Sequence, residues 1–185
     1  MMARLATAAC LVAGVVSCGG GGGSATGDDG GTPTGDGGAQ APFIAFTSTF
    51  AAFRTWPSFH SDGPPDDGTF TPDVLGPRTQ YINMVPPPGS TEFPIGTVIV
   101  EARENGTQKI FAGVKRGNDF NKTGAVNWEW FELSENPIAI TWRGFGPPNG
   151  ETYGGDPDGG CNACHVKCGL NTDYVCSAKL QLAAF

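Results

Sequence analysis

Hydrophobic and polar positions alternate in short runs along the middle of the chain, the pattern of half-buried β-strands. Turn-forming segments such as "ENG" and "GNDFNKTG" separate the runs. Connections this short join antiparallel strands, because parallel strands require long crossovers. The runs are "QYINMV", "GTVIVEA", "KIFAGVKR", "AVNWEWFEL" and "IAITWRG".

The same alternation assigns side chains to the two faces of the predicted sheet. Trp128 and Trp130 share one face, and Glu129 between them lies on the other. Glu101 faces away from Val100 by the same rule. Spacing alone thus assigns two carboxylates and two indoles to faces of the predicted sheet.

A helical period precedes the strands. Phe43, Phe46, Phe50 and Phe53 recur at steps of three, four and three, which predicts an amphipathic helix. Pro57 ends this helix shortly after its last turn. The next segment, "HSDGPPDDGTFTPDVLGP", is rich in Gly, Pro and Asp and is predicted to be a loop.

The N-terminus has the pattern of an export signal. Arg4 precedes an apolar run, Leu5–Val16, that is too short to span a bilayer as a stable helix. The run ends in "VVSC", which resembles the lipobox of bacterial lipoproteins and implies cleavage after residues 1–17 and diacylation of Cys18. Such an anchor would hold the chain on the periplasmic side of the envelope. Gly19 is not an inner-membrane retention signal and favours the outer membrane. An ordinary cleaved signal, with Cys18 left as a thiol, is the alternative.

Composition separates a tether from a folded domain. Residues 18–41 are almost all Gly, Ser, Thr, Asp and Ala, and cannot bury enough apolar surface to order themselves. Residues 42–185 form the predicted domain. The net charge of -7 excludes a general affinity for nucleic acid or anionic lipid, so the membrane contact is only the lipid anchor.

The stretch "GGCNACHVKCGL" concentrates the candidate chemistry. Cys161, Cys164 and His165 form C-x-x-C-H, the attachment signature of c-type haem. Two cysteines one helical turn apart can form thioethers with one porphyrin edge, and the adjacent histidine then coordinates the iron. Export supports this interpretation, because covalent haem attachment takes place outside the cytoplasm.

Three other interpretations use the same residues. Cys161, Cys164, Cys168 and Cys176 could form two disulfides, a four-cysteine zinc or iron–sulfur site, or a redox-active C-x-x-C. Counting the chain's six cysteines favours haem. One leaves with the signal, one takes lipid and two take haem, and then Cys168 and Cys176 remain to pair as a disulfide.

Several segments follow one another along the predicted domain: "FRTWPSFH", "FPIGTVIVE", "FAGVKRG", "NWEWFEL", "WRG", "YGG", "CNACH" and "TDYV". This ordered set resembles the cytochrome P-460 family and covers nearly all of residues 42–185. The resemblance implies a mainly antiparallel β domain, often a homodimer, with one haem c and His165 as proximal iron ligand. The predicted class is α+β: mainly antiparallel sheet, an N-terminal helix and a short C-terminal haem-binding helix.

The family has two branches, and one residue bears on the choice. One branch oxidises hydroxylamine or nitric oxide and has a lysine cross-linked to the porphyrin. The other, similar to cytochrome c-prime-beta, binds nitric oxide or carbon monoxide. Glu101 stands where the cross-linking lysine is expected, while Lys109 and Lys115 lie on the next strand. This departure weakens the hydroxylamine or nitric oxide oxidoreductase interpretation and predicts an ordinary haem c.

The distal side of the haem decides the function. If His60 or Met84 is the sixth ligand, the protein is an electron-transfer cytochrome that serves a redox partner protein. If neither is, the site is open to a small gas or nitrogen-containing ligand, Glu101 is a candidate proton relay, and Arg143 a candidate partner of a haem propionate. The alternatives are structural: His60 as a hydrogen-bonding residue, Met84 as core filling, Glu101 as a solvated strand end and Arg143 as a surface arginine. A non-haem disulfide or metal-binding surface domain is the third class.

Overall fold

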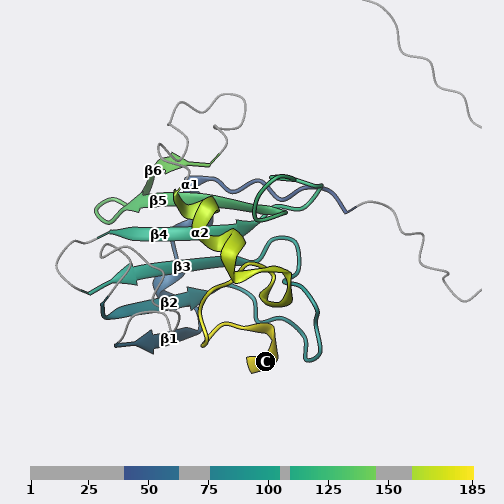
Figure 1. Cartoon of the computed structure of the whole chain (residues 1–185). Coiled ribbons are helices and arrows are strands. Elements are labelled where there is room, and N and C mark those ends of the chain that lie inside the picture. The colour runs from purple at the N-terminus through teal and green to yellow at the C-terminus, as the bar shows by residue number, and fades with distance from the viewer. Residues whose placement is uncertain (1–39, 63–75, 105–108, 145–159) are drawn as a thin grey trace, which may run out of the picture. The chain divides into compact units, whose positions relative to one another are not determined.

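The computed structural model describes residues 40–62, 76–104, 109–144 and 160–185. The predicted signal peptide, Cys18 and almost all of the tether lie outside these residues. Within these residues, six strands form one sheet in which every neighbouring pair is antiparallel and the spatial order follows the sequence (Figure 1). The prediction of an α+β fold that is mainly antiparallel sheet is confirmed. The strands are β1 (Ser58–Ser61), β2 (Arg78–Ile82), β3 (Val98–Arg103), β4 (Ile110–Lys115), β5 (Trp128–Ser134) and β6 (Ala139–Arg143).

Strand β1 was missed from the sequence, because its four residues fall between Pro57 and a run of turn-forming residues. The structure pairs β1 with β2, with His60 opposite Thr79. Only Phe59 of this strand packs against a core, so the strand carries too little alternation to be recognised.

The N-terminal helix is much shorter than the phenylalanine spacing predicts. One α-helical turn, α1 (Thr47–Phe50), is followed by a 3-10 turn, η1 (Phe53–Thr55). Phe43 lies in extended chain and its N–H donates to the carbonyl of Arg116 at 2.9 Å, while Phe46 is 44% exposed. Only Phe50 and Phe53 of the stripe are buried. A hydrogen bond to the residue that follows β4 takes the place of the first predicted turns.

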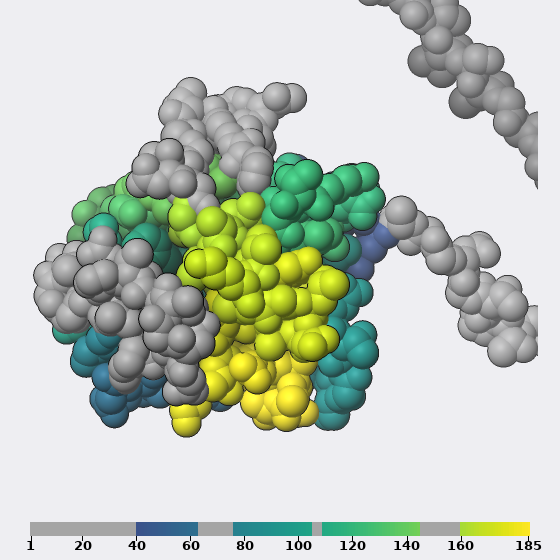
Figure 2. All heavy atoms as spheres, viewed as in Figure 1, coloured from purple at the N-terminus to yellow at the C-terminus, as the bar shows by residue number. Residues whose placement is uncertain are grey.

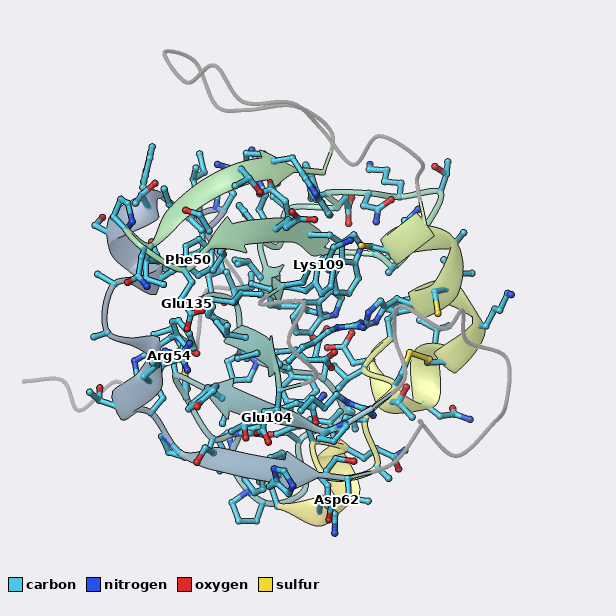
Figure 3. All side chains as sticks on the ribbon, turned by 90° about the vertical axis from the view of Figure 1, so that its left-hand side faces the viewer. Phe50, Arg54, Asp62, Glu104, Lys109 and Glu135 are labelled. Atoms are coloured by element: carbon cyan, nitrogen blue, oxygen red, sulfur yellow. A yellow bond between two sulfur atoms is a disulfide. The ribbon has the colours of Figure 1, made fainter. Side chains whose placement is uncertain are left out.

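The C-terminal segment contains α2 (Gly160–Cys168), η3 (Leu170–Thr172) and η4 (Leu182–Ala184). Among the described residues, no helix has the length and apolar character needed to cross a membrane. Helix α2 lies across the sheet in Figure 1, and Figure 2 shows the C-terminal segment covering this face. Figure 3 shows α1 and α2 on opposite sides of the sheet.

The sheet therefore has two faces, each with its own core. The α1 face carries Val98, Val100, Val114 and Phe131, which pack against Phe50 and Phe53. The α2 face carries a second core that includes residues of the C-terminal segment. Its buried members are Ile82, Phe93, Ala125, Trp128, Trp130, Tyr174, Val175, Leu180 and Leu182.

Candidate functional site

Helix α2 carries the C-x-x-C-H motif and presents it to the sheet. Cys161 and Cys164 are half-buried and one helical turn apart, and Cys161 packs against the α2-face core. Asn162, between the two cysteines, accepts hydrogen bonds from the Asn121 side-chain amide at 2.6 Å and the Ala125 N–H at 2.9 Å. These bonds fix the helix on the β4–β5 connection.

His165 is held through one ring nitrogen. Its Nδ1 lies 2.6 Å from the carbonyl oxygen of Tyr174, which can only accept, so Nδ1 carries the proton and donates. Within the described part of the chain, the hydrogen bonds of His165 use Nδ1. This tautomer leaves the Nε2 lone pair for a metal, the arrangement usual for histidine ligands.

Burial lowers the pKa of His165 to about 4, against a smaller raising effect of the bond to Tyr174. The imidazole is therefore neutral at neutral pH, which is the form that ligates metals. Trp130 stacks on the ring with centroids 3.9 Å apart and planes 25° apart. Stacking covers a face of the imidazole, whereas ligation uses the lone pair in the ring plane.

Gly113 makes room for the indole under His165. A Cβ at this position would lie 2.7 Å from Cζ3 of Trp130 and 3.4 Å from Cε3 of Trp128. The two indoles stack with centroids 5.9 Å apart and planes 9° apart. The predicted common face of Trp128 and Trp130 is confirmed, and it is the face that meets His165.

The disulfide predicted between Cys168 and Cys176 is present. It closes the loop that follows α2, and the Cys176 Sγ lies 3.6 Å from the His165 Nδ1. A four-cysteine metal site would need both of these sulfurs as thiolates, so the disulfide argues against it. In residues 40–62, 76–104, 109–144 and 160–185, no group of three or more His, Cys, Asp or Glu side chains could hold a metal ion.

The residues around the motif fit a covalently attached haem. Cys161 and Cys164 stand on one helix at thioether spacing, and His165 follows in the ligating tautomer. The Tyr174 carbonyl supplies the outer hydrogen bond that histidine ligands generally have.

Glu101 lies on the α2 face. It is opposite Phe111, in the row of the sheet next to that of Gly113 and Trp130. Gln80 donates to its carboxylate at 3.1 Å, and the Nε of Arg78 is 3.3 Å away. Burial raises the pKa of Glu101, although Arg78, Arg103 and Gln80 oppose the shift. A carboxyl group that exchanges a proton nearer neutral pH is thus on the same face as His165.

Arg143 is not with the motif. It is fully buried on the α1 face, where Nε and Nη2 each donate to Glu129 at 2.5 Å and Nη1 donates to the Ala45 carbonyl. Its predicted contact with a haem propionate is therefore corrected: this guanidinium is a structural partner of Glu129.

The two candidate distal ligands also lie elsewhere. His60 is on the α1 face of edge strand β1, 47% exposed, with Nε2 2.7 Å from Asp62 and Nδ1 3.3 Å from Glu104. These carboxylates raise the pKa of His60. Met84 is 37% exposed after β2, with its methyl group beside Gly96. Exposure also makes the core-filling interpretation of Met84 wrong.

Of the two lysines considered for a cross-link, Lys109 is exposed and Lys115 is buried on the α2 face. Lys115 Nζ donates to both carboxylate oxygens of Asp173, at 2.5 and 2.7 Å. This pair was not expected from the sequence, because 58 residues separate its members. Burial raises the pKa of Asp173 against the effect of Lys115.

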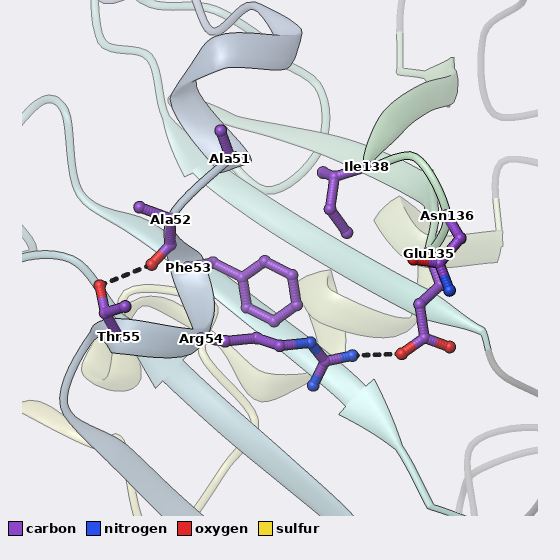
Figure 4. Close-up of a pocket in the computed structure, with 8 residues that line it drawn as sticks. All are labelled: Ala51, Ala52, Phe53, Arg54, Thr55, Glu135, Asn136 and Ile138. Carbon is purple, nitrogen blue, oxygen red and sulfur yellow. Dashed lines mark hydrogen bonds and ion pairs between the residues drawn. The ribbon is translucent and has the colours of Figure 1, made fainter.

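A shallow pocket lies on the α1 side of the molecule (Figure 4). Arg54 and Glu135 form an ion pair at 2.6 Å in its lining, and this pair is solvent-exposed and mutually satisfied. The remaining lining is mostly small or apolar, so the pocket offers no reactive group. It is lined by Ala51, Ala52, Phe53, Arg54, Thr55, Glu135, Asn136 and Ile138.

Comparison with protein-family models, curated proteins and solved structures finds no match to this chain. Sequence reasoning identified Cys161, Cys164 and His165, but missed Trp130 as the stacking partner and Tyr174 as the hydrogen-bond acceptor. The interaction of Tyr174 is through its backbone carbonyl, which residue type does not signal.

Proposed function

We propose that this protein is an exported monohaem c-type cytochrome with His165 as the proximal iron ligand. The observation that carries the proposal is the C-x-x-C-H motif on α2, with Nδ1 of His165 held by the Tyr174 carbonyl. Cys161 and Cys164 would form the thioethers and Nε2 of His165 would ligate the iron. Bound haem would supply an iron centre able to bind a diatomic or small nitrogen-containing ligand, or to exchange an electron.

The placement of the other candidates favours an open distal site. His60 lies on the α1 face, and Met84 lies in the turn after β2. A six-coordinate electron carrier would require one of them to reach the α2 face. We therefore propose binding or redox processing of nitric oxide or hydroxylamine.

Glu101 is the residue we assign to proton exchange at this site. It shares the α2 face with His165, and burial favours its protonated form. A carboxyl group of this kind can give or take a proton as a bound ligand changes its charge. Arg78 and Gln80 would hold it in place.

Absorption spectroscopy tests the proposal. The mature chain, produced with a haem c assembly system, is expected to hold haem that resists extraction into acidified organic solvent, and its reduced spectrum is expected to shift on addition of nitric oxide. Cys161→Ser with Cys164→Ser removes the covalent link, while Arg54→Ala on the α1 face is the matched control. A chain that stays colourless contradicts the haem proposal. A low-spin spectrum that nitric oxide does not change contradicts the open site.

The export route, homodimer and redox partner form part of the same proposal. Cys18 would carry the lipid and fix the chain on the periplasmic side of the envelope. Labelling with a radioactive fatty acid, lost in Cys18→Ala, tests the anchor. Light scattering of the chain without its first 18 residues tests for a dimer.

A further inference from the structure

A buried ion pair lies next to the residue that holds His165. Lys115 and Asp173 are 2% and 5% exposed, and both carboxylate oxygens accept from the ammonium group. Asp173 also accepts from the backbone N–H of Phe93 at 2.8 Å and from the indole Nε1 of Trp128 at 3.4 Å. Lys115 and Trp128 are on central strands, so this carboxylate is fixed to the rigid part of the molecule.

The backbone at Asp173 and Tyr174 needs such a support. Both residues have positive φ, 48° and 63°, a conformation that costs a non-glycine residue about 1 kcal/mol or more. The N–H of Tyr174 donates to the Gly169 carbonyl at 2.9 Å, which closes the turn after α2. In this conformation the Tyr174 carbonyl lies 2.6 Å from Nδ1 of His165.

An ion pair is not the cheapest way to fill this part of the core. Apolar residues of similar size are often as stable as a buried ion pair, because both charges lose their hydration. A carboxylate with several hydrogen bonds, unlike an apolar side chain, fixes the position and orientation of the adjacent peptide. Here that peptide carries the acceptor for His165.

We propose that Lys115 and Asp173 are positioning residues for His165. They hold the left-handed turn, the turn aims the Tyr174 carbonyl, and the carbonyl keeps the proton on Nδ1 and the lone pair on Nε2. The description of Nε2 as an iron ligand rests on the proposed function. A hydrogen bond at Nδ1 raises the basicity of the ligating nitrogen, which favours oxidised iron and lowers the reduction potential.

Nuclear magnetic resonance of the full mature chain without haem tests the link directly. The chain has only two histidines, so ¹⁵N-histidine labelling gives two resolved imidazoles, with His60 on the α1 face as internal reference. Wild type is expected to show His165 as the Nδ1–H tautomer at pH 7. In Lys115→Met with Asp173→Asn, which keeps the net charge, the ratio of tautomers should change about two- to tenfold, the range for loss of one hydrogen bond.

The matched control is Glu129→Gln with Arg143→Met, which removes a buried ion pair of the same sheet from the α1 face. It is expected to lower stability and leave the His165 tautomer unchanged. If circular dichroism shows that the Lys115 and Asp173 double variant is unfolded, the two single variants Lys115→Arg and Asp173→Asn are measured instead. Lys115→Arg should retain most of the Nδ1–H form. An unchanged His165 in a folded Asp173→Asn chain would overturn the proposal.

In the haem-loaded protein, the reduction potential is the second measurement. The double variant should have a higher potential, by a two- to tenfold change in the reduction equilibrium constant, up to about 59 mV for a one-electron couple. The two proposals fail separately. A chain that takes no haem contradicts the proposed function, and the tautomer measurement still decides the role of Lys115 and Asp173. A haem-loaded chain with unchanged tautomer and potential contradicts only the positioning role.

Discussion

Removal of the disulfide that follows α2 has a calculable effect. Cys168 and Cys176 are eight residues apart, and the cross-link restricts only the loop between them in the unfolded chain. The chain-entropy relation gives a loss of about 8 cal/mol/K for such a loop, which is roughly 2.5 kcal/mol at 25 °C. We therefore expect Cys168→Ser with Cys176→Ser to lower the free energy of unfolding by about this amount, and Tm by roughly 5–10 °C.

Urea unfolding followed by circular dichroism measures this loss. Wild-type protein whose disulfide has first been reduced with a dithiol should show the same loss of unfolding free energy, because reduction removes the same constraint on the unfolded chain. Ser177→Ala is the nearest side-chain control: it deletes a buried hydroxyl that donates to Gln80 and keeps the disulfide. A loss below about 1 kcal/mol in the double variant, with the reduced wild type unchanged, would refute the loop-entropy reasoning.

Three further predictions concern the sheet and His165. Gly113→Ala should lower the free energy of unfolding by about 1–3 kcal/mol and change the near-ultraviolet circular dichroism, because its methyl group would push against the Trp130 ring. Gly89→Ala is the control: a Cβ there meets nothing within 4 Å, so the substitution strains the backbone without crowding a neighbour. Stability of the haem-free chain should fall between about pH 6.5 and 4, by at most about 3 kcal/mol, because the lowered pKa of His165 makes the unfolded state bind the proton first. His165→Gln should remove that slope in a pH series of urea midpoints. Glu129→Gln leaves the guanidinium of buried Arg143 without its carboxylate and should lower the free energy of unfolding by about 3–5 kcal/mol in the same assay. A loss under about 1 kcal/mol would contradict the burial of this ion pair.

The strands were predictable because each has its own alternation. Five runs became β2 to β6, and short turns between them gave the antiparallel order. The prediction of a helix over Phe43 and Phe46 was wrong. Periodicity cannot show that the Phe43 N–H donates to a distant part of the chain, here the carbonyl of Arg116 just after β4. Strand β1 carries one inward aromatic residue, which is too little pattern to detect.

The site was predictable only where it is local. The two cysteines and the histidine lie within five residues of one another in the sequence, and their spacing is the signature of the motif. Trp130 meets this motif through the tertiary fold, and the Tyr174 contact uses a group that every residue has. Arg143 misled the sequence analysis because its type suits a propionate as well as it suits Glu129.

The order of strands has a consequence for the timing of assembly. Each strand pairs with its sequence neighbour, so the sheet can form one hairpin at a time, and each step closes only a short loop at a small entropy cost. Residues 160–185 follow all six strands and pack on the α2 face that those strands create. We expect this segment to dock last. Under the proposed function, Cys161 and Cys164 would then be accessible to the enzyme that attaches haem while the sheet face on which the segment packs is already formed.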